Sequence, residues 1–370
     1  MMPLRAPVWP ALVITLCNAL IAPFAQGQIR PHKNVICGTV LETETRFPVV
    51  NVNVFLSNTK IGTGTDTQGS FSLDGIPSGR YDVVFSCVGY ERVIQSVLLD
   101  RDTTVTINVR LKPRAIIIPG VEVLGESRSA WERQRNMRMF LEEFLGKTNN
   151  AAKCKVLNQD VIHLSWDTTE ILTASSDSAI IVENRALGYR LSVELIGFTF
   201  NAKLKGVKLF YYPRFEDLVP IDSQEVRRWR ANREKSYLGS RRHFFRSLFH
   251  RSLAKDGFQV TSGTGLDIYN RPGYPVTDSL HIGFSPDSLT CWLDLEAAFL
   301  SREYLRIDFQ SGYARSRLDD YNSSIFEARQ PRILIVLGEL DDPRSIAVYG
   351  RWARDRIAEE VPLEYVARER

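Results

Sequence analysis

Between residues 35 and 111 the chain repeats one pattern: short runs of alternating apolar and polar side chains, separated by turn-forming residues. Two runs show the alternation most clearly, one formed by Val50, Val52, Val54 and Leu56, the other by Val105, Ile107, Val109 and Leu111. Successive side chains of a strand point to opposite faces, so a period of two predicts strands with one buried face. We therefore expect this segment to fold as a small β-sandwich.

The turns between these runs are also informative. Asp66 can accept hydrogen bonds from backbone N–H groups further along its turn, and Gly69 can adopt a positive φ without steric cost. Phe71 and Leu73 are then expected to begin the next strand with their side chains in the core. The run Gly62–Gly64 precedes a strand rather than a helix, so it predicts a hairpin and not a phosphate-binding loop.

Five segments follow one another in the order found in one known family. They are residues 35–40, residues 48–52, the turn of residues 65–71, Gly79-Arg80-Tyr81 and Val88-Gly89-Tyr90. Together they resemble the carboxypeptidase regulatory-like domain, found in many envelope proteins of Bacteroidetes-type bacteria. The resemblance implies a transthyretin-like (prealbumin-like) sandwich of about seven strands over residues 34–112. It also implies a folding and interaction module, because the peptidase chemistry of those enzymes lies in another domain.

The histidines do not support a zinc peptidase site. Such a site needs two histidines and a glutamate, with His and Glu close together on one element. None of the five histidines is followed by a glutamate three or four residues later; they are His32, His163, His243, His250 and His281. His243 and His250 would lie about 10 Å apart along a helix and cannot share one metal ion. We therefore expect no metal, no cofactor and no carboxypeptidase activity.

The N-terminus predicts export. Arg5 precedes an apolar stretch over residues 6–24, and Ala25-Gln26-Gly27 has the small residues that a signal peptidase reads. Cleavage is expected after Gly27, so that the mature chain begins at Gln28 and is periplasmic or associated with the outer membrane. An uncleaved membrane anchor is the alternative, since the stretch approaches the roughly 20 residues that span a bilayer, but its prolines weaken such a helix.

Four cysteines remain after this cleavage: Cys37, Cys87, Cys154 and Cys291. Their spacing matches neither a redox motif nor a zinc pattern. Buried free thiols are the simplest expectation. A bridge between Cys37 and Cys87 stays open, because both residues belong to the first domain.

A chain of 370 residues is long enough for a second domain. Residues 113–126 are predicted to be a linker, and residues 127–370 a larger β-rich α+β domain, which makes the whole chain mainly β with α additions. Ser129 and Glu132 have capping-box spacing and predict a helix that ends at Leu145. Many short strands follow, so we expect an antiparallel sheet that is strongly curved or partly closed into a barrel.

Four stretches of this second domain also resemble envelope proteins that carry the same N-terminal domain: residues 140–146, 184–189, 237–245 and 350–365. The resemblance implies no reaction.

Nine basic side chains lie between residues 227 and 251. Asp222 and Ser240 can cap two helices there, and Val226, Trp229 and Tyr237 provide an apolar stripe. One interpretation is a helical hairpin with a solvated arginine-rich exterior. The other is a face that binds an envelope protein or an anionic glycan or lipid, with peripheral association with the outer membrane. The candidate residues for this face are Arg228, Arg242, His243, Arg246 and His250.

These features predict a non-catalytic exported envelope protein that binds a partner. Nucleic acid is not expected, because the chain is exported and its formal net charge is only +4. The alternative is a hydrolase acting on cell-wall or polysaccharide material through scattered residues of the second domain. It would need convergent ionisable side chains in a deep pocket, and carboxylates such as Asp294 with Glu296, or Asp319 with Asp320, could supply acid–base groups.

Overall fold

The computed structural model describes residues 34–114, 126–264, 279–281, 290–293, 296–299, 304–309, 323–330, 333–336 and 338–367. The predicted signal peptide and cleavage site, His32 and most of the predicted linker lie outside these ranges. The same is true of Asp294, Asp319 and Asp320, and of the side chains of His281, Cys291 and Glu296.

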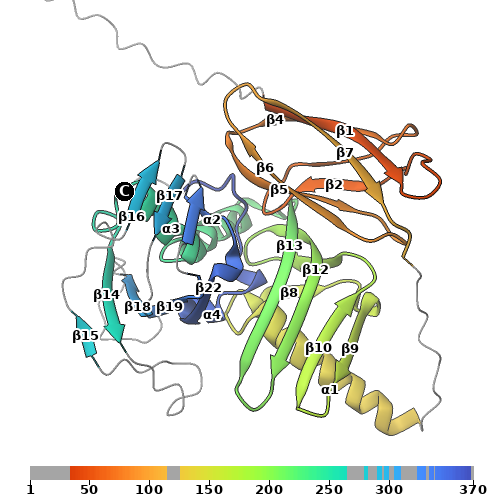
Figure 1. Ribbon diagram of the computed structural model, residues 1–370. Helices are drawn as coiled ribbons and strands as arrows, with labels where there is room; N and C mark the ends of the chain where they lie inside the picture. Colours follow the sequence, from red (N-terminus) through yellow and green to blue (C-terminus); the bar gives the residue numbers. More distant parts are fainter. Residues whose placement is uncertain are drawn as a thin grey trace, which may run out of the picture. The chain divides into compact units, whose positions relative to one another are not determined.

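The first region is the expected sandwich, and it begins at β1 (Figure 1). Its seven strands are β1 (Asn34–Glu42), β2 (Asn53–Leu56), β3 (Gly62–Gly64), β4 (Ser70–Ile76), β5 (Gly79–Ser86), β6 (Val93–Leu99) and β7 (Thr104–Leu111). One sheet has the order β4-β1-β7 and the other β3-β2-β5-β6. β1 pairs with β7 in parallel and with β4 antiparallel. Apolar side chains from both sheets form a single buried cluster.

The predicted turn chemistry is confirmed. Asp66 Oδ1 accepts hydrogen bonds from the backbone N–H groups of Gln68 and Ser70, at 2.9 and 2.8 Å. Gly69 has φ +71°, and a Cβ there would lie 2.4 Å from the Val40 carbonyl oxygen. Phe71 and Leu73 are buried as expected.

The strand predicted from the alternation at Val50 begins only three residues later, at Asn53. Val50 is 42% exposed, because it lies in a turn before β2 rather than in a strand. Phe55 is fully buried together with its neighbours Val54 and Leu56, so β2 is covered on both faces. A short strand covered on both sides cannot show a clean period of two.

Cys37, Cys87 and Cys154 are free thiols, so no bridge joins Cys37 to Cys87. Cys37 lies on β1 and Cys87 follows β5, which belongs to the other sheet. All three are half-buried rather than fully buried, which corrects part of the expectation.

The second region begins with helix α1 (Glu126–Leu145). It starts before Ser129, so Ser129 does not cap it as predicted. A six-stranded antiparallel sheet follows, made of β8 (Cys154–Val156), β9 (Ile162–Trp166), β10 (Ile171–Ser176), β11 (Ile180–Asn184), β12 (Tyr189–Asn201) and β13 (Gly206–Asp217). Phe140 of α1 packs edge-on against Phe198 of β12, with ring centroids 4.9 Å apart, and this contact joins the helix to the sheet.

The later strands form two further sheets. One contains β14 (Phe258–Thr264), β15 (Ser279–His281), β18 (Tyr304–Phe309), β19 (Ser323–Ala328) and β22 (Ile346–Gly350). The other contains β16 (Thr290–Leu293), β17 (Glu296–Phe299), β20 (Ile333–Val336) and β21 (Glu339–Leu340). The expectation of one curved or partly closed sheet is therefore wrong for the described strands, because different helices cover separate cores.

Three more helices belong to this region: α2 (Ser223–Tyr237), α3 (Arg241–Phe249) and α4 (Arg351–Arg354). Short 3-10 turns occur at Ala151–Lys153, Gln159–Val161, Pro343–Ser345 and Ile357–Glu359. Within the described residues, none of the helices combines the length and apolarity that crossing a membrane requires.

Backbone hydrogen bonds also join the sandwich to the second region. The backbone N–H of Asn58, in the turn after β2, donates to the Pro213 carbonyl of β13 at 2.7 Å, and Phe215 N–H donates to the Thr59 carbonyl at 2.8 Å. Arg92 forms an ion pair with Glu194 of β12, whose side chain is only 2% exposed. The sandwich is thus bonded directly to the sheet that begins the second region.

Candidate functional site

Helix α2 is anchored by its inner side to the turn between β11 and β12. Trp229 Nε1 donates a hydrogen bond to the Arg185 carbonyl at 2.8 Å, and Asn232 Nδ2 donates to the Ala186 carbonyl at 2.8 Å. Arg233 donates to the next two carbonyls, of Leu187 and Gly188, at 2.7 and 3.2 Å. Four consecutive carbonyl groups of one turn therefore hold one face of the helix.

Gly188 allows this close approach. Its φ is +72°, and a Cβ built there would lie 2.2 Å from the Trp229 ring. Trp229 itself is 5% exposed. The guanidinium of Arg233 lies 3.9 Å from the centroid of the Tyr189 ring, a cation–π contact that holds a second side chain of the inner face.

The start of α2 is capped as the sequence predicted. Asp222 Oδ1 accepts from Glu225 N–H at 2.7 Å, and Glu225 Oε2 accepts from Ile221 N–H at 2.8 Å. This reciprocal arrangement fixes the backbone on both sides of the cap. Ser240 likewise caps α3, accepting from His243 N–H at 3.1 Å.

The outer side of α2 is cationic. Its exposed basic residues are Arg227, Arg228, Arg230 and Lys235. In the part of the chain that the structure describes, none of these four side chains forms an ion pair or hydrogen bond. At about 100° per residue, Arg227, Arg228, Arg230 and Lys235 all lie at least 100° around the helix from Trp229, so they share its outer half.

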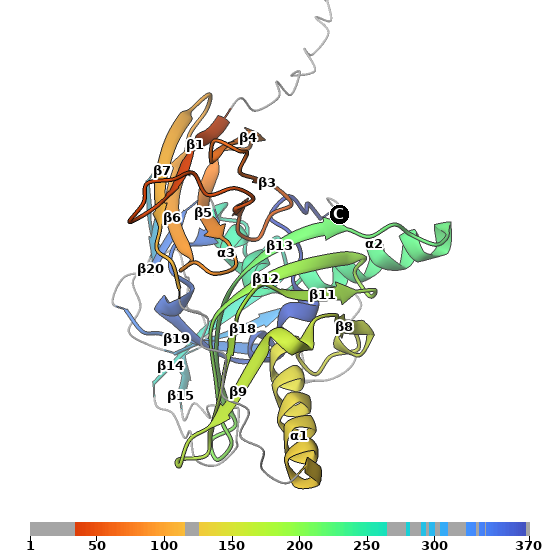
Figure 2. The same ribbon diagram turned by 90° about the vertical axis from the view of Figure 1, so that its right-hand side faces the viewer.

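The loop before α2 exposes two apolar side chains. Val219 is 84% exposed and Ile221 is 83% exposed, the highest values among the large apolar residues that the structure describes. In Figure 2 the loop between β13 and α2 lies at the outer edge of the ribbon, and α2 runs back from it. We call Val219, Ile221 and the four cations of α2 the α2 face.

Two of the sequence-predicted residues are used inside the protein instead. Arg242 and Arg246 both donate to Glu339 Oε1, at 2.8 and 3.1 Å. Arg242 also donates to the Val361 and Pro362 carbonyls, and it is only 14% exposed. Their prediction as part of an open face is wrong, because both arginines pair with Glu339 and donate to carbonyl groups of the C-terminal segment.

His243 is also misplaced by the sequence prediction. It is 8% exposed, and its Nδ1 accepts a hydrogen bond from Gly239 N–H at 3.0 Å. Its ring packs against Tyr237, Phe258 and Phe309, with centroid distances of 5.0, 4.8 and 5.6 Å. It therefore belongs to the core and not to the solvent side of α3.

Arg228 and His250 remain exposed as predicted. His250 is the C-terminal cap of α3, and its ring meets the edge of Phe249 at 5.3 Å. Of the five predicted residues, the structure brings Arg242 and Arg246 together, on Glu339. Arg228 instead lies among cations of α2 that the sequence placed in the basic cluster but did not select.

Sequence reasoning missed Val219 and Ile221 entirely. The only local signal is two large apolar residues on either side of Pro220, directly before a helix cap. Such a pattern is equally typical of a loop that folds onto the core, so their exposure could not be inferred.

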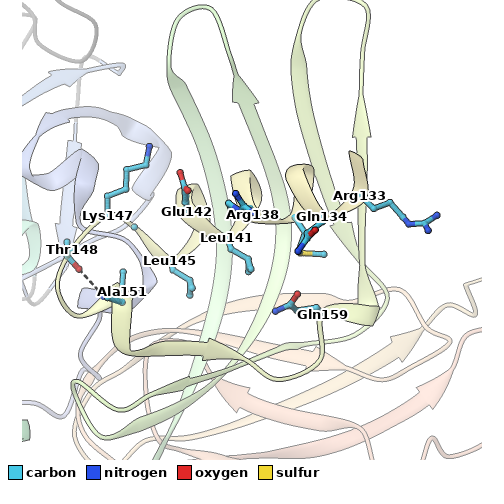
Figure 3. A pocket seen from close by; sticks show the side chains of 13 residues that line it. Arg133, Gln134, Arg138, Leu141, Glu142, Leu145, Lys147, Thr148, Ala151 and Gln159 are labelled. Carbon is cyan, nitrogen blue, oxygen red and sulfur yellow. Dashed lines mark hydrogen bonds between the residues drawn. The ribbon is translucent and has the colours of Figure 1, made fainter. Parts of the chain in front are cut away.

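A hollow lies along α1 and has a volume of about 730 Å³ (Figure 3). Met137, Leu141 and Leu145 supply its apolar part, and Arg133, Arg138 and Lys147 its cations. Glu142 is the one carboxylate among the described residues that line it. This hollow does not provide the pair of acid–base groups that the hydrolase alternative requires.

The ionisable groups with strongly shifted pKa values lie elsewhere, in the interior. Burial raises the pKa of Asp355 to about 6, despite its ion pair with Arg351. Burial likewise raises the pKa of Cys154 to about 12 and that of Tyr211 well above its ordinary value. Within the described residues, His, Cys, Asp and Glu side chains form no group of three that could hold a metal ion.

Comparison with known proteins places the first region in a family. The match covers residues 36–123. These residues carry a CarboxypepD_reg-like domain. Domains of this family are non-catalytic regulatory domains. The CarboxypepD_reg-like match includes all seven strands of the sandwich except the first two residues of β1, and it extends to residue 123, beyond the predicted segment of residues 34–112.

Solved structures are similar over parts of the chain. The pilus 2b backbone protein of group B streptococcus is 15% identical over 22% of this chain and 42% of its own, with a TM-score of 0.20. The 5-hydroxyisourate hydrolase of Klebsiella pneumoniae is 19% identical over 22% of this chain and 91% of its own, with a TM-score of 0.20. A Bacteroides uniformis protein, whose name assigns it provisionally to carbohydrate binding, is 10% identical over 50% of this chain and 80% of its own, with a TM-score of 0.19. This chain thus spans less than half of the pilus protein. No curated protein matches it.

Proposed function

We propose that this protein is an exported, non-catalytic binding protein of the bacterial envelope, and that it holds an anionic component through the α2 face. The observation that carries the proposal is a set of four cations, Arg227, Arg228, Arg230 and Lys235, without a partner among the described residues. Unpaired arginines on one side of a helix are well suited to carboxylate, sulfate or phosphate groups, since the guanidinium forms bidentate hydrogen bonds with them.

The anchoring of α2 supports this proposal. The helix is held through Trp229, Asn232 and Arg233, so its outer cations are presented on a rigid element. A rigid arrangement loses less conformational entropy on binding than flexible side chains on a loop would. Two nearby carboxylates are already engaged: Glu225 bonds to the cap, and Asp217 pairs with Lys60 and Arg233.

The CarboxypepD_reg-like domain supports a binding rather than a catalytic role for the first region. The proposal includes export with cleavage after Gly27. N-terminal sequencing of the protein recovered from the cell envelope should find Gln28 as its first residue. Recovery of an intact N-terminus from the envelope would contradict this cleavage.

Anion binding is tested with dextran sulfate as probe and uncharged dextran as reference. The triple variant Arg227→Gln, Arg228→Gln, Arg230→Gln is compared with a control that has the same charge change on the sandwich: Arg101→Gln, Arg110→Gln, Arg114→Gln. All six arginines are exposed, so both variants should fold like the wild type. We expect the wild type to bind dextran sulfate, with affinity falling as salt rises.

The α2 variant should lose most of this binding, and the sandwich control should keep it. Equal losses in both variants would mean that only net charge matters. Undiminished binding by the α2 variant would show that the anion site lies elsewhere. Either result overturns the proposal.

A further inference from the structure

We infer that the α2 face is a docking surface for a membrane that contains anionic lipid, with Val219 and Ile221 entering the headgroup region. The inference rests on the proposed function and names the class of its ligand. A soluble polyanion would use only the four cations. The two exposed apolar side chains beside them need a ligand with an apolar layer under its charges.

The geometry of the α2 face matches a bilayer surface. Arg227 lies five positions after the cap residue Asp222, or about 8 Å along the helix axis at 1.5 Å per residue. Interfacial segments bury their apolar side chains about 5–10 Å into the boundary between headgroups and acyl chains. Arg227 and Arg228 are therefore near enough to Val219 and Ile221 to reach lipid phosphates while those two side chains insert. Arg230 and Lys235 lie about 12 and 20 Å from the cap along the axis, and they reach phosphates when the helix lies along the membrane surface.

The local backbone keeps the two apolar side chains in solvent. Pro220 between them restricts the loop, and the Ile221 N–H is bonded to Glu225. The loop is therefore fixed at its junction with α2 and does not fold Ile221 onto the core. Val219 and Ile221 expose 84% and 83% of their surface. Covering these side chains with an apolar partner would remove this surface from water, which is favourable.

Arginine suits the same surface. Its long apolar stem can lie along acyl chains while the guanidinium stays at the level of the phosphates. Charges near an anionic membrane each strengthen binding about fivefold, which corresponds to about 1 kcal/mol per charge. Four cations with two short apolar insertions therefore predict reversible, salt-dependent binding, well short of permanent anchoring.

The test uses the full chain and sedimentation with two kinds of vesicle, one of phosphatidylcholine and one containing about 30% phosphatidylglycerol. The variant is Val219→Ser, Ile221→Ser. Its control is Val88→Ser, Leu204→Ser, two apolar residues that are 64% and 71% exposed elsewhere in the chain. Circular dichroism should show all variants folded, because every substituted side chain is exposed.

We expect the wild type to sediment with the anionic vesicles and not with the neutral ones. The Val219→Ser, Ile221→Ser variant should bind anionic vesicles about tenfold to hundredfold more weakly and keep its affinity for dextran sulfate. The Val88→Ser, Leu204→Ser control should bind both like the wild type.

Two outcomes separate the inference from the proposed function. If Val219→Ser, Ile221→Ser leaves vesicle binding unchanged, or if the wild type binds dextran sulfate but no vesicle, the face recognises a glycan or a protein and the membrane inference is wrong. If the wild type binds neither dextran sulfate nor anionic vesicles, the proposed function itself fails.

Discussion

Replacement of Gly188 by alanine tests how α2 is held in place. Two costs arise at once. The residue has φ +72°, a left-handed conformation that costs an alanine about 1–2 kcal/mol. Its Cβ would also lie 2.2 Å from the Trp229 ring, so the indole must leave its site on the β11–β12 turn.

The second cost is the larger one. Displacement breaks the hydrogen bond from Trp229 Nε1 to the Arg185 carbonyl, which contributes about 1 kcal/mol. A tryptophan buries about 200 Å², and exposing half of that area costs about 2.5 kcal/mol at 25 cal/mol per Å². We expect Gly188→Ala to lower the free energy of unfolding by about 4.5–5.5 kcal/mol in total.

Urea unfolding followed by circular dichroism measures this loss, and two glycines serve as matched controls. Gly206→Ala should be neutral within about 0.5 kcal/mol, because its Cβ would meet open space. Gly75 has φ +70° and open space around it, so Gly75→Ala should show only the backbone cost. In a Trp229→Ala background, Gly188→Ala should cost no more than Gly75→Ala does. A Gly188→Ala variant as stable as Gly75→Ala would refute the packing argument.

Three further predictions concern other parts of the chain. Burial raises the pKa of Asp355 in the folded state to about 6, so its contribution to stability is full below pH 4 and is lost as the pH rises through 6. The free energy of unfolding, measured at a series of pH values, should therefore fall by up to about 3 kcal/mol in the wild type relative to Asp355→Asn. In the sandwich, Asp66→Ala removes the acceptor for Ser70 N–H and should lower the melting temperature, at a cost of about 1–2 kcal/mol; no change would mean that the turn forms without it. Arg92→Ala leaves the buried Glu194 carboxylate unpaired and should lower the free energy of unfolding in urea by about 3–5 kcal/mol. In a Glu194→Gln background the same substitution should cost less, and equal costs in both backgrounds would show that the ion pair does not stabilise the fold.

Local chemistry predicted much of this structure well. The sandwich turn at Asp66 and Gly69 depends on hydrogen bonds and sterics that act within five residues, and it formed as expected. The caps at Asp222 and Ser240 are equally local and were confirmed. Val50 shows the limit, since alternation does not reveal the position where a strand begins.

The candidate site was predicted less well, because long-range pairing decides which cations remain free. Arg242 lies 97 positions before Glu339, the carboxylate that neutralises it. A helical projection of α3 alone placed His243 on an outer face, but Phe258 and Phe309 arrive from later strands and bury it. No property of residues 241–250 taken by themselves contains that information.

The alternating strands and turns of the first domain and the two capped helices follow from the sequence alone, because steric limits on φ and short-range hydrogen bonds involve only neighbouring residues. The number of about seven strands came from the family resemblance. The tertiary structure alone determined that Arg242 and Arg246 pair with Glu339 and that His243 is buried, while Arg228 and its basic neighbours on α2 stay exposed. It also placed Val219 and Ile221 in solvent. Burial and charge neutralisation depend on partners brought together by the fold, and those partners are distant along the chain.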